Sequence, residues 1–263
     1  MLNRVTGYLC QITVGFALFV GLAVAGVSGA AHAGEALVAV ASNFAEPLQK
    51  LKAEFEKNSS HRISISIGSS GKLYAQIING APFEIFLSAD QARPILLEKA
   101  QEIVQSSRFT YAIGRLTLWS ADKSQITDDG KKVLSSAAFS TLAIANPQLA
   151  PYGRAAREVL SSLGVFESLK DKIVEGQNIG QTFSFVATGN AQLGLVARSY
   201  VMSHRNKITG SSWDVPLDLY QPIRQDGVLI TGADKNPAAI AFFDFIKSQK
   251  ARALIAQFGY GLE

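Results

Sequence analysis

The chain has 263 residues, of which 48% are hydrophobic and 17% charged, with one cysteine and a formal net charge of +4. This charge is too small to predict nucleic-acid binding, and no basic stripe with interleaved aromatic residues occurs. A single cysteine excludes an internal disulfide, so stability must come from a hydrophobic core, which a chain of this length can form. We therefore expect small-molecule partners and no nucleic acid.

The first segment in chain order, residues 1–33, is expected to be a cleaved signal peptide. Arg4 precedes an apolar run from Ile12 to Val27, and Ala31 and Ala33 form the small-x-small pattern of a cleavage site. The alternative is an uncleaved anchor helix, but the run, about 16 residues, is shorter than the roughly 20 that span a bilayer. The pattern predicts export.

Cleavage would remove Cys10 and leave residues 34–263 without any cysteine. No later segment is long and apolar enough to predict a membrane span. We expect a soluble, exported protein.

Strand-like and helix-like segments then alternate to the end of the chain, which predicts an α/β fold with mostly parallel sheets. The expected strands are 37–41, 63–67, 83–87, 109–121, 141–145, 172–174, 193–197 and 220–231. The expected helices are 44–55, a segment opened by 68–71 and closed by 79–82, a helix around Pro94, 154–163 and 238–258.

Two of these extended segments, 109–121 and 220–231, are unusually long and bracket a middle block. This arrangement predicts two α/β lobes that meet at a cleft, because the chain would leave the first lobe, build the second and return. We place lobe I at 34–116 plus 226–263 and lobe II at 117–225. No internal repeat or low-complexity linker marks these boundaries.

Four loops occupy the position where open parallel sheets bind ligands, between a strand and the next helix. They are residues 41–43, 68–71, 150–153 and 177–180. Each loop is small or turn-forming, and none carries a carboxylate at its tip. The first turn of a helix offers unpaired N–H donors and a partial positive charge, so this pattern predicts an oxyanion site without a formal cation.

A purely structural interpretation remains open for each loop taken alone. Asn43 and Glu46 fit a capping box, and Ser and Asn are preferred N-caps in any protein. Tyr152 could be a turn aromatic and Ile179 a core residue. Asp90 fits the N-cap of the helix around Pro94.

The nearby basic residues Lys72, Arg154 and Arg157 are expected to be solvated helix residues that add positive potential. Catalysis has little support, because the two histidines after the signal, His61 and His204, lie beside no nucleophile and in no metal-ligand spacing. We therefore predict that the protein is not an enzyme, has no cofactor and binds no metal through direct protein ligands. An exported hydrolase or transferase is the weaker alternative.

Several strings in the mature chain resemble the periplasmic molybdate/tungstate-binding proteins of ABC importers, in order and over nearly its whole length. They are Ala41-Ser42-Asn43-Phe44, Gly68-Ser69-Ser70-Gly71, YAQIINGAP (74–82), FLSAD (86–90), RFTYAIGRLTLWSA (108–121) and NPQLAPYG (146–153). The resemblance implies a two-lobed, type II periplasmic binding protein in which two strands cross between the lobes. It also implies a permease and, through it, an ATPase subunit as partners.

By motif position, the resemblance places the contacts to molybdate or tungstate on Ser42, Asn43, Ser70, Tyr152 and Ile179. Another branch of the family has Ala-Ser-Leu and Pro-Ala-Gly where this chain has Ser-Asn-Phe and Pro-Tyr-Gly, so that branch's contact set does not apply. Ile179 stands where other members often have Val, which is harmless if the contact is its backbone N–H.

Neutral donors alone suit a fully deprotonated dianion, whereas phosphate keeps a proton near neutral pH and needs an acceptor. Sulfate has the right charge but is smaller, so a cleft set for molybdate would leave its hydrogen bonds long. The alternative within this class is a binding protein for another small anion, such as sulfate, thiosulfate or an organic acid. An amino-bearing organic acid would need an acidic residue in the cleft, for which Glu46 and Asp90 are the candidates.

Overall fold

Strands and helices alternate along the chain, as the sequence predicts. The computed structural model describes residues 33–127, 129–204 and 209–263. The predicted signal peptide up to residue 32, including Cys10, lies outside the described residues. Among the described residues, no helix is long and apolar enough to cross a membrane.

The strands are β1 Glu35–Ala41, β2 Arg62–Gly68, β3 Ile85–Leu87, β4 Phe109–Gly114, β5 Leu116–Ser120, β6 Leu142–Ala145, β7 Ile173–Gly176, β8 Leu193–Ala197, β9 Ser211–Asp214 and β10 Ile223–Leu229. The α-helices are α1 Ala45–Glu56, α2 Ser70–Ile78, α3 Ala92–Lys99, α4 Gly130–Ser136, α5 Pro151–Ser162, α6 Phe166–Leu169, α7 Ile179–Ala187, α8 Arg198–His204, α9 Pro237–Lys247 and α10 Gln249–Gln257. Short 3₁₀ helices are η1 Ser42–Phe44, η2 Lys170–Lys172, η3 Leu217–Leu219 and η4 Ala233–Lys235.

The strands form two five-stranded sheets with matching order, β2-β1-β3-β10-β4 and β7-β6-β8-β5-β9. In each sheet the first three strands pair in parallel, and the fourth is antiparallel to both of its neighbours. The predicted α/β architecture with mixed, mostly parallel sheets is confirmed. The division into lobes at 117 and 225 remains a prediction, and we call the parts built on the first and second sheets lobe I and lobe II.

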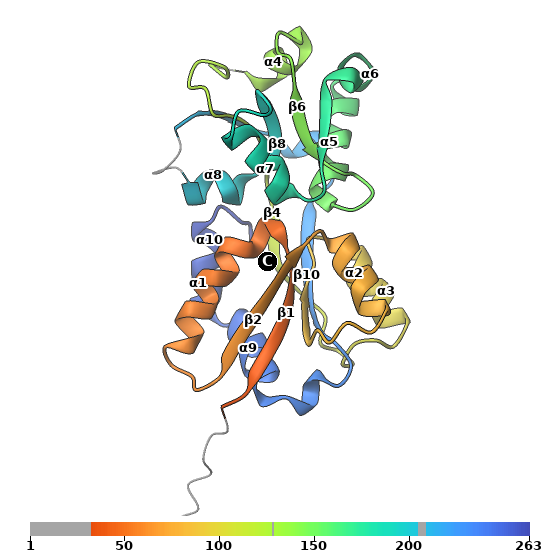
Figure 1. The fold of residues 1–263 in the computed structure, drawn as a ribbon, viewed down its shortest axis with the longest axis vertical. Helices are drawn as coiled ribbons and strands as arrows, with labels where there is room; N and C mark the ends of the chain where they lie inside the picture. Colours follow the sequence, from red (N-terminus) through yellow and green to blue (C-terminus); the bar gives the residue numbers. More distant parts are fainter. Residues whose placement is uncertain (1–32, 128, 205–208) are drawn as a thin grey trace, which may run out of the picture. The chain divides into compact units, whose positions relative to one another are not determined.

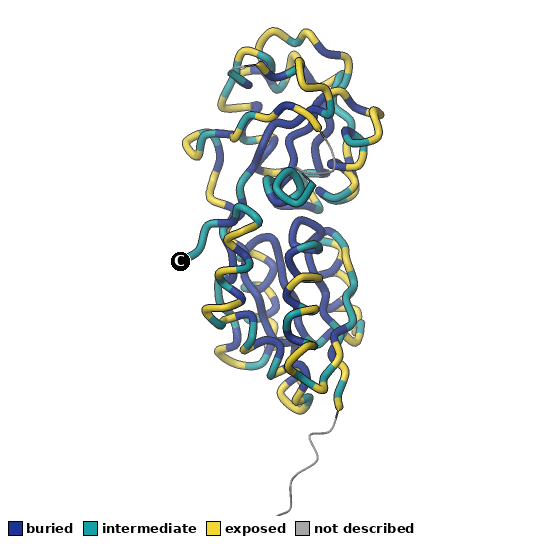
Figure 2. Tube along the Cα trace, turned by 90° about the vertical axis from the view of Figure 1, so that its left-hand side faces the viewer, coloured by how far each residue is buried: buried dark blue, intermediate teal, exposed yellow. Residues whose placement is uncertain are grey.

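Each sheet is covered by helices on both faces, because its strands carry apolar side chains on both sides. In lobe I, Val38 and Val40 of β1 pack in a cluster with α1, α9 and α10, whereas Ala39 packs in another with α2 and α3. Figure 1 shows α1 and α2 on opposite sides of β1. In lobe II, α4, α5 and α6 cover one face and α7 the other. Figure 2 shows buried chain running through both sheets.

The long extended segment predicted at 109–121 is two strands that belong to different sheets. Gly114, the last residue of β4, pairs with Ile223 in lobe I, whereas Leu116, the first of β5, pairs with Ala197 in lobe II. The strand pattern alone could not show this break, since one residue, Arg115, separates the two strands. The chain returns to lobe I through β10, beside β4.

Candidate functional site

One cavity lies where four helices begin, two in each lobe. Its lining includes all five predicted residues, Ser42, Asn43, Ser70, Tyr152 and Ile179. The others are alanine, glycine, serine and proline, so no charged side chain lines it. The space not filled by atoms is about 170 Å³, part of which is open to solvent. The cavity therefore suits a small polar guest.

Each of the four helix starts leaves one backbone N–H at the cavity without an acceptor among the described residues. These are the N–H groups of Asn43, Ser70, Tyr152 and Ile179. They are unpaired because the first N–H groups of a helix have no carbonyl one turn earlier. At the last three starts, the next N–H along the chain is already bonded, by Leu149 O, Ala150 O and the Ser42 hydroxyl.

The hydroxyls of Ser42 and Ser70 are set to donate into the cavity. Ser70 Oγ accepts a hydrogen bond from Ala89 N–H at 2.9 Å, and Ser42 Oγ accepts from Gly180 N–H at 3.2 Å. A hydroxyl that accepts from a fixed N–H keeps its proton for another acceptor. For Ser42 the fixed donor comes from lobe II, so its proton is oriented only when the lobes are together.

Tyr152 contributes to the cavity through its main chain. The structure corrects the start of α5 from 154 to Pro151, which places Tyr152 in the first turn of the helix. Its side chain is buried, and its hydroxyl accepts from Gln225 Nε2 at 3.3 Å.

The capping box expected from Asn43 and Glu46 is wrong. Helix α1 begins at Ala45 after the 3₁₀ turn, and its N-cap Phe44 makes no side-chain cap bond. Asn43 Nδ2 instead donates to Gln225 Oε1 at 2.8 Å and to Tyr260 Oη at 2.9 Å. Glu46 lies 3.2 Å from His204 Nε2 on α8 of lobe II.

Two hydroxyls on α8 hold the carbonyls of the first loop, and neither was anticipated. Tyr200 donates to Ser42 O at 2.6 Å, and Ser199 donates to Asn43 O at 2.9 Å. Because lobe II holds these two carbonyls, the backbone N–H group of Asn43 is fixed in orientation. Helix α8 itself was missed, since Arg198–His204 is short and follows β8 without a loop signal.

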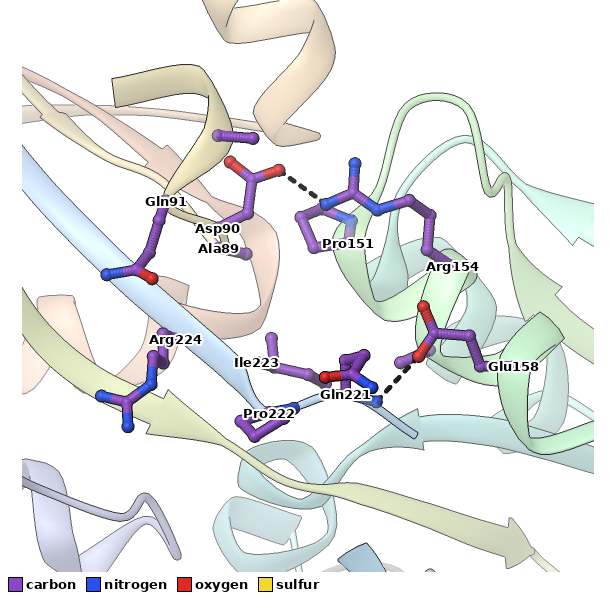
Figure 3. A pocket seen from close by; sticks show the side chains of 12 residues that line it. Ala89, Asp90, Gln91, Pro151, Arg154, Glu158, Gln221, Pro222, Ile223 and Arg224 are labelled. Atoms are coloured by element: carbon purple, nitrogen blue, oxygen red, sulfur yellow. Dashed lines mark hydrogen bonds and ion pairs between the residues drawn. The ribbon is translucent and has the colours of Figure 1, made fainter. Parts of the chain in front are cut away.

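Asp90 lies near the cavity, and Figure 3 shows its ion pair with Arg154 in the adjoining pocket. Its carboxylate pairs with Arg93 of its own helix α3 and, at 2.9 Å, with Arg154 of lobe II. The helix begins at Ala92 with Gln91 as its N-cap, although Asp90 Oδ1 does accept from Arg93 N–H at 3.2 Å. Arg154 was expected to be only solvated; it joins the two lobes instead.

A polar cluster behind the cavity links the lobes and was not predicted. It consists of Asn43, Tyr111, Tyr152, Gln225 and Tyr260, all buried. Burial raises the pKa of Tyr111 and of Tyr152 well above the usual range for tyrosine. The only sequence signal was the polar Gln225-Asp226 pair inside a strand, where the register of β10 against β4 shifts.

Within the described residues, no group of three or more histidine, cysteine, aspartate and glutamate side chains could hold a metal ion. The donors at the cavity are N–H and O–H groups, which suit the oxygen atoms of an anion.

Comparison with known proteins places the whole described fold in one family. The family model "Bacterial extracellular solute-binding protein" matches residues 36–261. A molybdate-binding protein ModA of Azotobacter vinelandii is 50% identical over 246 residues, covering 94% of this chain and 97% of that protein. One from Rhodobacter capsulatus is 45% identical, covering 91% and 93%.

The solved periplasmic molybdate-binding protein of Azotobacter vinelandii matches the fold with a TM-score of 0.83 and 42% identity, covering 87% of this chain and 99% of that one. This match agrees with the two-sheet topology. The chain belongs to the bacterial extracellular solute-binding protein family.

Proposed function

We propose that the protein binds molybdate outside the cytoplasm and delivers it to an ABC importer. The observation that carries this proposal is the convergence of four unpaired N–H groups and two serine hydroxyls on one cavity that no charged side chain lines. A ligand that only accepts hydrogen bonds fits such a site. The two relatives at 50% and 45% identity are both named molybdate-binding proteins.

The engaged carboxylates favour a fully deprotonated oxyanion over phosphate. Asp90 pairs with two guanidinium groups and Glu46 lies beside His204, and neither lines the cavity. A protonated anion would therefore find no carboxylate to accept its proton, and an amine would find none to pair with. Tungstate, which is close to molybdate in size, should bind through the same donors.

The donors supply enough free energy for tight binding. Each hydrogen bond to a charged group contributes about 1.5 to 3 kcal/mol, so a handful can offset desolvation and leave at least micromolar affinity, roughly −8 kcal/mol. Four of these donors come from lobe I and two from lobe II. The ligand therefore stabilises the closed arrangement over an open one.

The ligand-bound form would then dock on a membrane permease and, through it, reach the ATPase subunit. On this account the protein is a periplasmic carrier and not an enzyme, acts as a monomer and needs no cofactor. Its five ligand contacts are proposed to be Ser42, Asn43, Ser70, Tyr152 and Ile179, with oxygen atoms of the anion and not the metal facing the protein.

Calorimetric titration of residues 34–263 with molybdate, tungstate, sulfate and phosphate tests the proposal. We expect tight binding of molybdate and tungstate, weaker binding of sulfate and the weakest binding of phosphate. Tight sulfate or phosphate binding without a molybdate signal would reject it.

A further inference from the structure

Asn43, which lines the cavity, has a buried side-chain oxygen without a partner among the described residues. Asn43 Oδ1 is the one buried side-chain polar atom without a partner among the described residues. Asn43 lines the cavity, and its Nδ2 is bonded to Gln225 and Tyr260, which do not line it. The atom left for a guest is thus an acceptor, which an oxyanion would avoid.

A second hydrogen-bonding conflict lies on the other side of Gln225. Tyr111 Oη is 2.9 Å from Ser88 O and 3.1 Å from Gln225 Oε1. Both are acceptors, and a tyrosine hydroxyl has a single proton to give. In this orientation of the two side-chain amides, Asn43 Oδ1 is unpaired. Ser88 O and Gln225 Oε1 compete for the one hydroxyl proton of Tyr111.

Turning both amides by 180° about their terminal torsions removes both conflicts. Asn43 Oδ1 would then lie beside Tyr260 Oη and compete for its proton with Asn43 O, which keeps a second donor in Ser199 Oγ. Gln225 Nε2 would then donate to Asn43 Oδ1 and to Tyr111 Oη, whose proton stays on Ser88 O. Gln225 Oε1 would accept from the Tyr152 hydroxyl. Asn43 Nδ2 would face the cavity as a donor, so this setting needs an acceptor there.

We infer that Gln225 is a positioning residue whose amide turns together with that of Asn43, so that an oxyanion in the cavity selects the donor end of Asn43. This inference rests on the proposed function. Because Gln225 lies on β10 of lobe I and contacts Tyr152 of lobe II, the same rotation makes Tyr152 the donor of the bond across the lobes. Binding would thereby be coupled to the lobe contact behind the cavity.

Side-chain amide resonances of ¹⁵N-labelled residues 34–263 test the coupled rotation in the unchanged protein. We expect the NH₂ signals of both Asn43 and Gln225 to shift when molybdate is added. Asn236 is the internal control, since its Nδ2 is bonded to Glu84 Oε1 at 2.6 Å and to Glu35 O at 2.7 Å in lobe I. A shift of Asn43 alone, with Gln225 unmoved, would overturn the inference.

Two substitutions give a second, independent test. With its carboxyl group ionised, Gln225→Glu offers only acceptor oxygens, so Asn43 Nδ2 must stay turned toward it and Oδ1 away from it. Molybdate affinity should fall on the order of 10- to 100-fold. Hydrogen phosphate can donate its proton to Oδ1, so the molybdate-to-phosphate affinity ratio should also fall.

Gln225→Met is the matched control, because it has a similar size but no polar atom and leaves the Asn43 amide free to turn. We expect molybdate affinity to fall by less than about tenfold, with the molybdate-to-phosphate affinity ratio unchanged. Equal losses in both variants with the same ratio would mean a purely structural role and would overturn the inference. If the Glu variant does not fold, the amide signals of the unchanged protein decide.

The two proposals fail in different ways. No molybdate binding by the unchanged protein would refute the proposed function, and this inference with it. Molybdate binding with unmoved Gln225 signals would refute the inference alone.

Discussion

Replacing Gly114 by alanine should weaken ligand binding by opposing the contact between the lobes. A methyl group there would lie 2.7 Å from Gln225 Nε2 and 2.9 Å from Tyr152 Cζ, with the Tyr152 hydroxyl closer still. Gly114 and Gln225 belong to lobe I and Tyr152 to lobe II, so the part of the clash that involves Tyr152 is made only when the lobes are together. Overpacking of this kind costs about 1 to 3 kcal/mol, which corresponds to roughly 5- to 150-fold in the dissociation constant.

Calorimetry with molybdate measures the effect, and thermal unfolding of the ligand-free protein shows how much of the cost falls on the fold itself. The double variant Gly114→Ala/Tyr152→Phe should recover part of the affinity, because it removes the nearest atom. The reasoning fails if the dissociation constant of Gly114→Ala for molybdate lies within twofold of that of the unchanged protein. It also fails if the effects of Gly114→Ala and Tyr152→Phe on the binding free energy are additive in the double variant.

Three further predictions concern the site and its surroundings. Ser70→Ala should weaken molybdate binding about 10-fold or more by removing a hydroxyl donor to a charged ligand, with an unchanged melting temperature; equal affinity by calorimetry would remove Ser70 from the site. Arg154→Gln should change affinity less than about fivefold, because its partly exposed ion pair with Asp90 is worth about 0 to 1 kcal/mol; a larger loss would make the pair a major closing contact. Burial raises the pKa of Tyr111 above its usual 10.0, so folding stability should hold below pH 10 and fall as the pH rises beyond it, since the unfolded tyrosine ionises first. The Tyr111→Phe variant should lose less folding stability than the unchanged protein between pH 10 and 11, as measured by unfolding followed with circular dichroism. Parallel curves of stability against pH for the two proteins would contradict this.

Much of the fold could be predicted, because apolar periodicity directly reflects which faces are buried. The helix predicted over 44–55 is confirmed as α1, and its Leu48, Leu51 and Phe55 are buried in one cluster with the preceding Phe44. Predicted strand 193–197 is β8 to the residue. Short or polar elements were not predicted. An example is β9 at Ser211–Asp214, whose four residues show no clear alternation of apolar and polar side chains.

The four loops of the candidate site could also be found from sequence, since small residues before a helix are a local signal. Their contact residues remain a prediction, although the structure brings all five to one cavity. The residues that position them could not be found. Gln225, Tyr200 and Ser199 reach the first loop from more than 150 positions away in the chain, and no local pattern records such a contact.

The return of the chain to lobe I beside its point of departure makes lobe II an insertion. Gly114 and Ile223 lie opposite each other on neighbouring strands of one sheet, so a short turn could join them and excise residues 115–222. The product would retain the starts of η1 and α2 as a half-site with two of the four helix starts. Comparing its oxyanion affinity with that of the whole chain would measure how much the tethered second half adds through effective concentration.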